Sequence, residues 1–167
     1  MKAALAVLLL AVAAPVAARE TVGVWGGWGA FSDDGPRRCY AIARPVGGGT
    51  AFASVANWPG QNIRHQLHVR LSRVRAPSAR VTLSVGDRRF DLLAGDADAW
   101  APDSRTDMAI AAAMRSARSM SVEAQARDGG AFADTYALTG AATAIEAACG
   151  NSPSRARTSC HASSRLG

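Results

Sequence analysis

Apolar and polar side chains alternate along several short segments of this chain, and turn-forming residues separate the segments. In the clearest case, residues 63–71, one face carries Ile63, His65, Leu67, Val69 and Leu71, and the other carries Arg64, Gln66, His68 and Arg70. Because successive side chains of a β-strand point to opposite faces, this pattern predicts a strand with one face in the core and one in solvent. We therefore expect His65 to be a hydrogen-bonded core residue and His68 to face solvent.

Further alternating runs predict strands that pair as hairpins. The runs cover residues 39–44 and 52–57, 81–85 and 90–94, and 120–126 and 131–138. The segments between the members of each pair are Gly47-Gly48-Gly49, Gly86-Asp87 and Asp128-Gly129-Gly130. Such glycine-rich segments are typical of hairpin turns, so each pair is expected to form two antiparallel neighbours.

Helical spacing is confined to two short segments. In the first, Met108, Ala111, Ala112 and Met114 recur with a helical period after Ser104, a residue type that can cap a helix. In the second, residues 139–149, Thr139 would be the cap, and Ala141, Ile145 and Ala148 would face inward. The sequence therefore predicts a mainly β fold: an antiparallel β-sandwich or partly open barrel of about 7–8 short strands with one or two short α-helices.

The two ends of the chain differ in composition from the part between them. Lys2 precedes an apolar run that ends at Pro15, and small residues follow up to Ala18, which is the pattern of a secretory signal peptide. The run is shorter than the roughly 20 residues that a membrane-spanning helix needs, so we expect cleavage after Ala18 and no retained transmembrane anchor. Residues 151–167 are rich in serine and arginine without an apolar period, which predicts a disordered tail.

The expected organisation is therefore a signal peptide at residues 1–18, a single β-rich domain at 19–150 and a tail at 151–167, in a periplasmic or secreted protein. This division also changes the picture of charge. The formal net charge is +6, but residues 19–150 contain 15 arginines and 13 acidic residues, a net charge of only +2. The sequence has no basic stripe with interleaved aromatic residues, which nucleic-acid-binding surfaces use, so we expect no nucleic-acid partner.

The three cysteines are Cys39, Cys149 and Cys160. In an oxidising compartment thiols pair rather than bind zinc or stay free. A Cys39–Cys149 disulfide would bracket the predicted domain and leave Cys160 unpaired in the tail. A local pair between Cys149 and Cys160 is the alternative, and we favour the long-range pair of Cys39 with Cys149.

Several short motifs occur in the order seen in a known protein family. They are Gly23-Val24-Trp25-Gly26-Gly27-Trp28-Gly29-Ala30-Phe31, Arg38-Cys39-Tyr40-Ala41-Ile42-Ala43, His68-Val69-Arg70-Leu71-Ser72, Phe90-Asp91-Leu92-Leu93, Ala113-Met114-Arg115 and Asp134-Thr135-Tyr136-Ala137-Leu138-Thr139-Gly140-Ala141. Over most of residues 25–149 the chain resembles the invasion-associated locus B family of exported alphaproteobacterial proteins. The resemblance implies a periplasmic or secreted β-rich domain associated with entry into host cells. The family has no established catalytic residues to carry over, and the tail with Cys160 falls outside the pattern.

The sequence offers few groups for metal or acid–base chemistry. His65 and His68 point to opposite faces of the predicted strand, so a shared metal ion is not expected, and we expect no cofactor. Six aspartates surround Trp100 in the sequence: Asp87, Asp91, Asp96, Asp98, Asp103 and Asp107. They lack the spacing of an EF-hand, and we interpret this Asp-rich stretch as an ordinary polar loop in which Asp103 and Asp107 help to cap a helix.

Nucleophilic catalysis is not predicted, because the sequence contains no Gly-x-Ser-x-Gly elbow. The sequence favours a non-catalytic binding or envelope-associated protein, involved in host-cell interaction or invasion, whose partner is an unknown protein or envelope component. The candidate partner contacts are Trp28, Trp58 and Trp100. The alternative is a secreted, glycosidase-like hydrolase, in which carboxylates of the Asp-rich stretch would act while Trp28 or Trp100 stacks on a sugar.

Overall fold

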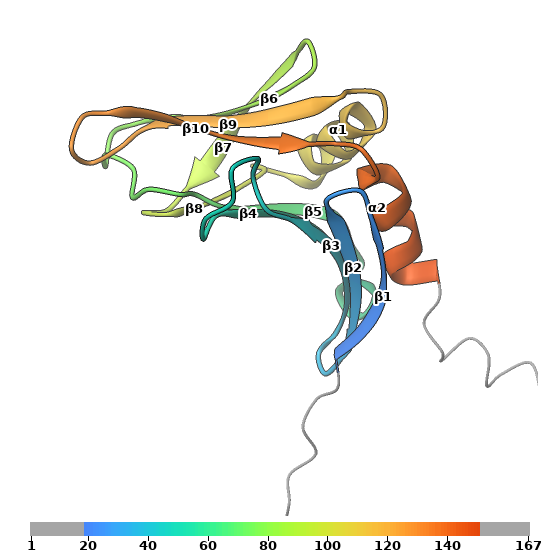
Figure 1. Ribbon diagram of the computed structural model, residues 1–167. Helices are drawn as coiled ribbons and strands as arrows, with labels where there is room; N and C mark the ends of the chain where they lie inside the picture. The colour runs from blue at the N-terminus through green and yellow to red at the C-terminus, as the bar shows by residue number, and fades with distance from the viewer. Residues whose placement is uncertain (1–18, 151–167) are drawn as a thin grey trace, which may run out of the picture.

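The computed structural model describes residues 19–150, which form ten strands and two α-helices (Figure 1). The strands are β1 (Arg19–Trp25), β2 (Trp28–Asp34), β3 (Arg37–Ala43), β4 (Phe52–Trp58), β5 (Ile63–Arg70), β6 (Val81–Val85), β7 (Arg88–Ala94), β8 (Asp98–Trp100), β9 (Ser119–Gln125) and β10 (Ala131–Ala137). The helices are α1 (Ser104–Met114) and α2 (Ala141–Gly150), and a 3₁₀ turn, η1 (Pro59–Gln61), lies between β4 and β5. The expected signal peptide and tail, residues 1–18 and 151–167, lie outside the described residues.

All ten strands belong to one antiparallel sheet in the order β1-β2-β3-β4-β5-β8-β7-β6-β9-β10, which is not closed into a barrel. The predicted mainly β, antiparallel fold is thus confirmed, as are the hairpins β3–β4, β6–β7 and β9–β10. Three strands go beyond the expected set. The glycine-rich sequence of β1 and β2 hides the alternation of these strands, and the three residues of β8 are too few to show a period.

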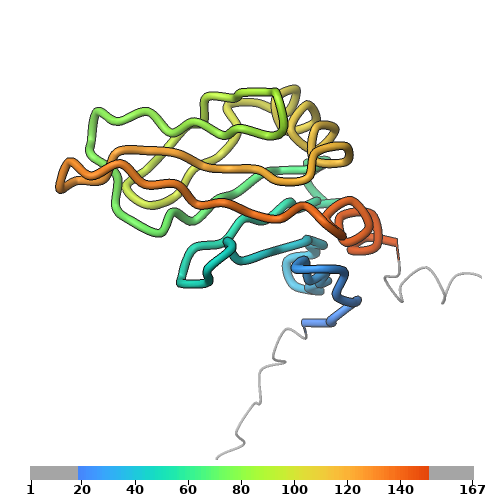
Figure 2. The backbone as a smooth tube through the Cα atoms, turned by 45° about the horizontal axis from the view of Figure 1, so that its top comes forward, coloured from blue at the N-terminus to red at the C-terminus, as the bar shows by residue number. Residues whose placement is uncertain are grey.

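The sheet folds over on itself, so that two layers face each other (Figures 1 and 2). One layer contains β1 to β5 and β8, and the other contains β6, β7, β9 and β10. The largest fully buried side chains are Trp28, Tyr136, Leu67, Leu83, Ile110, Met114, Met120, Val55, Val69, Val81, Val85 and Val122. Every second residue of β6 is buried, as period-two alternation requires when one face of a strand lies in the core.

Two hydrogen bonds partly cover β10, the last strand of the sheet. The backbone N–H of Val46 donates to the carbonyl oxygen of Thr135 at 2.7 Å. The indole N–H of Trp28 donates to the carbonyl oxygen of Ala137 at 2.8 Å. Main-chain groups of an edge strand attract other chains when they are left unpaired, so these two bonds both protect β10 and link it to the opposite layer.

Both helices pack on the core side of the first layer. Helix α2 contacts β1, β2 and β3, and Ala141, Ile145 and Ala148 face inward as predicted. Helix α1 contacts β5. Its N-cap is Asp103, whose carboxylate accepts from the N–H of Thr106 at 2.7 Å, so the predicted cap at Ser104 is wrong by one residue. No helix in the described part of the chain is long and apolar enough to cross a membrane.

We expected Asp107 to help cap α1, but its side chain turns toward β5 instead. Its Oδ1 accepts from the backbone N–H of Leu67 at 2.8 Å, and the residue is only 8% exposed. Burial raises the pKa of Asp107; the hydrogen bond from Leu67 opposes this shift, and the charge of Asp103 adds to it. The carboxylate therefore joins the helix to the sheet at the cost of burying a charge.

We expect Asp107→Ala to lower the free energy of unfolding by about 1–3 kcal/mol, because the N–H of Leu67 would lose its buried partner. Asp107→Asn keeps an acceptor oxygen without the charge and should lose less. Because the pKa is raised on folding, wild-type stability should fall as pH rises from the ordinary value of 3.8 through the raised pKa. The stability of the asparagine variant should not decrease over this pH range for the same reason. Urea unfolding at acidic and neutral pH measures both effects, and equal losses in the two variants would contradict the assigned hydrogen bond.

The turn between β1 and β2 lies directly against the start of α2 (Figure 1). A Cβ atom on Gly140, which has a φ of +85°, would lie 2.1 Å from the carbonyl oxygen of Trp25. A Cβ atom on Gly26 would lie 2.2 Å from the carbonyl oxygen of Thr139. The two backbone segments therefore approach each other too closely for any side chain, which fixes the position where α2 begins.

Candidate functional site

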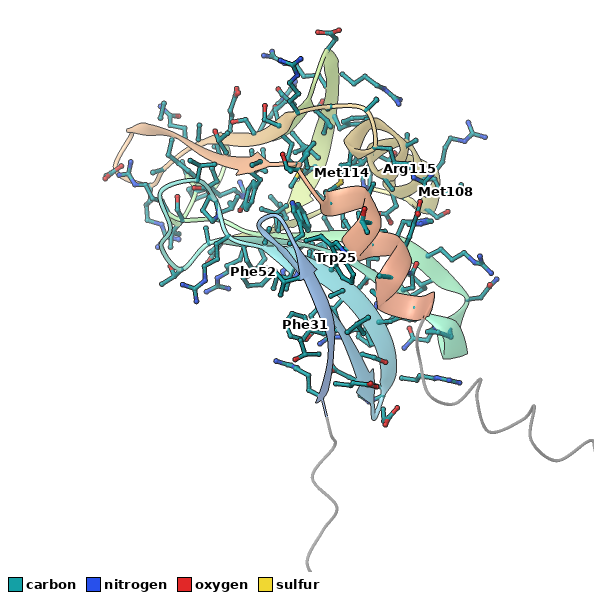
Figure 3. The ribbon with its side chains drawn as sticks, turned by 45° about the vertical axis from the view of Figure 1, so that its right-hand side comes forward. Trp25, Phe31, Phe52, Met108, Met114 and Arg115 are labelled. Carbon is teal, nitrogen blue, oxygen red and sulfur yellow. A yellow bond between two sulfur atoms is a disulfide. The ribbon has the colours of Figure 1, made fainter. Side chains whose placement is uncertain are left out.

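The first layer has one face that points away from the core, and we term it the outer face. No helix or strand of the described residues covers it, as the lower left of Figure 1 shows. Its side chains occupy alternate positions of each strand, because the intervening side chains point into the core. Phe31 of β2 and Phe52 of β4 are two of its aromatic residues (Figure 3).

One row of directly paired residues crosses the outer face from β1 to β8 and continues onto β7, the strand that pairs with β8 where the sheet passes into the second layer. In strand order, this cross-strand row consists of Val24, Gly29, Ile42, Ser54, His68, Trp100 and Leu93. Val24, Trp100 and Leu93 are 67%, 38% and 58% exposed. They are three of the six large hydrophobic residues that are exposed in the described part of the chain. Half of these exposed hydrophobic residues therefore lie on one row.

Trp100 is held in place by an ordered cluster on the outer face. The ring of His68 stacks on it at a centroid distance of 5.2 Å and an interplanar angle of 6°, and Phe52 packs edge-on against His68 at 5.2 Å. The Nε2 atom of His68 lies 2.9 Å from Oδ1 of Asp98, and an ionised carboxylate accepts from the ring N–H. Arg70 donates to the other oxygen of Asp98. The exposed indole of Trp100 is thus packed against a histidine ring whose own orientation is fixed by Asp98.

A second ordered cluster on the outer face surrounds Arg38. Its guanidinium lies 4.2 Å from the ring centroid of Tyr40 and 5.2 Å from that of Trp58. It also donates to Asp33 at 2.8 Å, which balances its charge. The indole N–H of Trp58 donates to the side-chain oxygen of Gln66 at 3.0 Å. Cation–π contacts and hydrogen bonds therefore fix the orientation of these side chains before any partner is bound.

The three tryptophans selected from the sequence do not all reach the surface. Trp58 and Trp100 lie on the outer face, where a partner can contact them. Trp28 is 0% exposed and donates its indole N–H into the fold, so its assignment as a surface contact is wrong. Trp28 occupies an inward position of β2, and the neighbouring Gly29 occupies the outward one.

Val24 and Leu93 were not selected from the sequence, although both belong to the cross-strand row. Leu92 and Leu93 are adjacent, so alternation in a strand would have indicated that one of them faces outward. Val24 stands in a glycine-rich segment that conceals the alternation of β1. Which residues form the row depends on how seven strands pair with one another, and no local sequence pattern contains that information.

The Asp-rich stretch does not gather its carboxylates in a cleft. Asp98 is bonded to His68 and Arg70, Asp103 caps α1, and Asp107 holds the main chain of β5. None of the six aspartates lines the cleft beside the disulfide or the surface depression over β6, β9 and β10. The interpretation of the whole stretch as an ordinary polar loop is wrong, because Asp91 lies in β7, Asp98 in β8 and Asp107 in α1.

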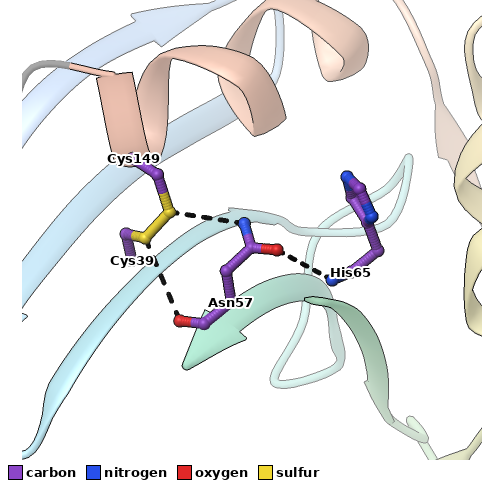
Figure 4. Close-up of a disulfide and its surroundings, with 4 residues drawn as sticks. All are labelled: Cys39, Asn57, His65 and Cys149. Carbon is purple, nitrogen blue, oxygen red and sulfur yellow. Dashed lines mark hydrogen bonds between the residues drawn. A yellow bond between two sulfur atoms is a disulfide. The ribbon is translucent and has the colours of Figure 1, made fainter. Parts of the chain in front are cut away.

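Cys39 and Cys149 form a disulfide that ties α2 to β3 (Figure 4). Their Cα atoms are 5.3 Å apart and 110 positions separate them in the sequence, so the predicted long-range pair is confirmed. The side-chain N–H of Asn57 donates to the sulfur of Cys149 at 3.4 Å, and the sulfur of Cys39 lies 3.9 Å from the carbonyl oxygen of Asn57. Cys160 lies outside the described residues.

The two histidines of β5 lie on different surfaces. His68 is on the outer face, as expected, although Phe52 and Trp100 cover part of its ring. His65 was expected in the core, but it is only partly buried and lines the cleft beside the disulfide. Among the described residues, no group of three or more histidine, cysteine or acidic side chains is arranged to hold a metal ion.

Comparison of the chain with protein-family models, with curated proteins and with solved structures yields no match. The resemblance to the invasion-associated locus B family therefore rests on the short sequence motifs alone and stays a prediction. What the chain does has to be argued from its own surfaces.

Proposed function

We propose that this chain is an exported, non-catalytic binding protein that presents the outer face of its sheet to a protein partner in the cell envelope or on a host cell. The observation that carries the proposal is the pair of Trp100 and Leu93, which are exposed and directly opposite each other on an uncovered face, with the exposed Val24 at the far end of the same cross-strand row. Exposed apolar groups that gather in one patch mark interaction sites, whereas single exposed ones need no explanation.

The chemistry of the outer face favours a protein as the partner. Tryptophan, tyrosine and arginine are the residues that contribute most to protein–protein binding, and Trp100, Trp58 and Arg38 supply accessible tryptophan and arginine here, whereas Tyr40 is buried beneath Arg38. The charges of Arg38 and Arg70 are already paired with Asp33 and Asp98, so the face presents aromatic surface with a balanced polar surround. Side chains that are ordered beforehand lose less entropy when a partner binds.

Export is supported by the disulfide, because such bonds persist in oxidising compartments and are rare in the cytosol. The signal-peptide pattern of residues 1–18 supports it as well. The role in host-cell interaction or invasion comes from the resemblance to the invasion-associated locus B family. The hydrolase alternative has no comparable support, because none of the six aspartates on which it depends lines the cleft or the surface depression, and Asp98, Asp103 and Asp107 have structural partners.

The test compares two variants that remove the same kind of exposed apolar surface at different places. Trp100→Ser combined with Leu93→Ser changes the cross-strand row, and Met108→Ser changes an exposed residue of α1. Partners of the wild-type protein are captured by cross-linking from the native envelope, and their affinity is then measured with purified proteins. We expect the row variant to lose at least about 30-fold in affinity, equivalent to about 2 kcal/mol, and the control to bind normally.

Thermal unfolding of each variant shows whether its fold is retained, so that a loss of binding is not a loss of structure. Equal affinities for the row variant and the control would contradict the outer face as the binding site. Turnover of a glycan or peptide library by the wild-type protein, with no partner captured, would favour the hydrolase instead.

A further inference from the structure

A cleft of about 630 Å³ opens beside the disulfide, between α2 and the adjacent ends of β3, β4 and β5. It opens on the side of the sheet that carries α2, so it is separate from the cross-strand row. Its basic lining residues are Arg37, Arg38, Arg64 and His65, and its one acidic lining residue is Glu146. The lining of the cleft therefore carries a net positive charge.

A β-bulge places two consecutive residues of β5 at this cleft. The register between β4 and β5 shifts at Asn57, so that this single residue opposes both Arg64 and His65. Consecutive side chains of a regular strand point to opposite faces, yet both of these residues line the cleft. Arg64 is exposed, as the alternation predicts, but the bulge re-aims its side chain so that it borders the cleft and not the row that contains His68.

The bulge is held by the side chain of Asn57 and by unusual backbone conformations. The Oδ1 atom of Asn57 accepts from the backbone N–H of His65 at 2.8 Å, while its N–H group donates to the disulfide (Figure 4). His65 and Asn62 both have a φ of +56°, and they are the two non-glycine residues with positive φ in the described part of the chain. Such conformations are costly, and they are concentrated at functional sites.

The positive charge at the cleft is only partly neutralised. Glu146 on α2 pairs with Arg115, which follows α1, at 3.4 Å. Arg38 on β3 pairs with Asp33. Arg64, in contrast, has no ion-pair partner among the described residues. Burial lowers the pKa of His65, and the charges of Arg115 and Arg64 lower it further, which is the effect of a positive field around the imidazole.

We propose that this cleft binds a small anionic ligand through a phosphate or carboxylate group, with Arg64 and His65 as its direct contacts. A guanidinium matches both oxyanions, because its parallel N–H groups can bind two oxygens at once. Ile63 and Ile145 also line the cleft and offer an apolar surface to the rest of the ligand. Arg38 lies at the border between this cleft and the outer face, but Arg64 and His65 are not part of the cross-strand row, and the proposal does not depend on the proposed function.

NMR titration of the histidine rings tests the proposal on the full chain. Inorganic phosphate and acetate are the probes, and chloride at the same ionic strength is the reference. Either probe should raise the pKa of His65 in a saturable manner, because a bound anion stabilises the imidazolium. His68 lies on the outer face and should not respond, so it serves as a control in the same spectrum. A response of His65 to phosphate but not to acetate identifies a phosphate group as the ligand. A response of His65 to acetate shows that the cleft binds a carboxylate group.

Two variants with the same change in net charge locate the site. Arg64→Gln should weaken the affinity for the anion about tenfold, whereas Arg89→Gln on β7 should leave it unchanged. The unchanged signal of His68 shows that each variant is folded. The proposal is overturned by equal shifts of His65 and His68, by an equal response to chloride, by the absence of saturation at His65, or by equal effects of the two variants.

Discussion

Replacing both Cys39 and Cys149 with alanine should lower the free energy of unfolding by about 4–5 kcal/mol. The disulfide joins residues that are 110 positions apart. Without it, the unfolded chain gains the conformational freedom that this loop closure removes, and the loop-entropy relation gives this magnitude for such a length. Domains of this size have a total stability of about 5–15 kcal/mol, so the variant should be close to unfolding at physiological temperature.

Equilibrium urea unfolding of the oxidised wild type, the reduced wild type and the double variant measures this loss. The reduced wild type and the double variant should agree, because the closed loop is what they both lack. Cys160→Ser removes a cysteine outside the Cys39–Cys149 pair and should leave the stability unchanged. A loss below about 1 kcal/mol in the double variant would mean that loop closure contributes little to this fold.

The sequence was informative wherever one local rule decides the structure. Alternation located β5 and β6, because the inward and outward positions of a half-buried strand differ in polarity. The pairing of Cys39 with Cys149 followed from the compartment that residues 1–18 indicate, together with the position of Cys160 in a tail without an apolar period. Such inferences need only the chain itself and one general property of strands or thiols.

The sequence was not informative where the outcome depends on contacts between distant segments. Trp28 is adjacent to Gly29, and either position could have faced the core; the pairing of β2 with β3 decides between them. Asp107 stands one turn from Asp103, which suits a role at the cap, but Leu67 offers a buried N–H from another element. The bulge at Asn57 breaks the alternation of β5, and no local signal marks that break.

Strand β5 brings the two candidate surfaces within three residues of each other. His68 faces outward beside Trp100, and His65 lines the cleft on the other side of the sheet. The strand is paired with β4 on one side and β8 on the other, so it is an interior strand held by hydrogen bonds along both edges. Residues on such a strand are positioned more precisely than residues on loops, which suits both binding sites.

Helix α2 forms one wall of the cleft, and it is fixed at both ends. The disulfide holds its last turn, and the close approach of Gly140 to Trp25 holds its start. Gly140→Ala should lower the free energy of unfolding by about 2–5 kcal/mol. A side chain at a φ of +85° costs about 1–2 kcal/mol, and a Cβ atom 2.1 Å from the carbonyl oxygen of Trp25 would force the two segments apart, at about 1–3 kcal/mol more.

Gly129→Ala is the matched control for this variant. Gly129 has nearly the same φ, +87°, but a Cβ atom there would have no neighbour within 4 Å. Its substitution should therefore cost only the backbone contribution of about 1–2 kcal/mol. The difference between the two variants in urea unfolding isolates the contact between the β1–β2 turn and α2. Equal losses would show that this contact yields easily and does not fix the start of α2.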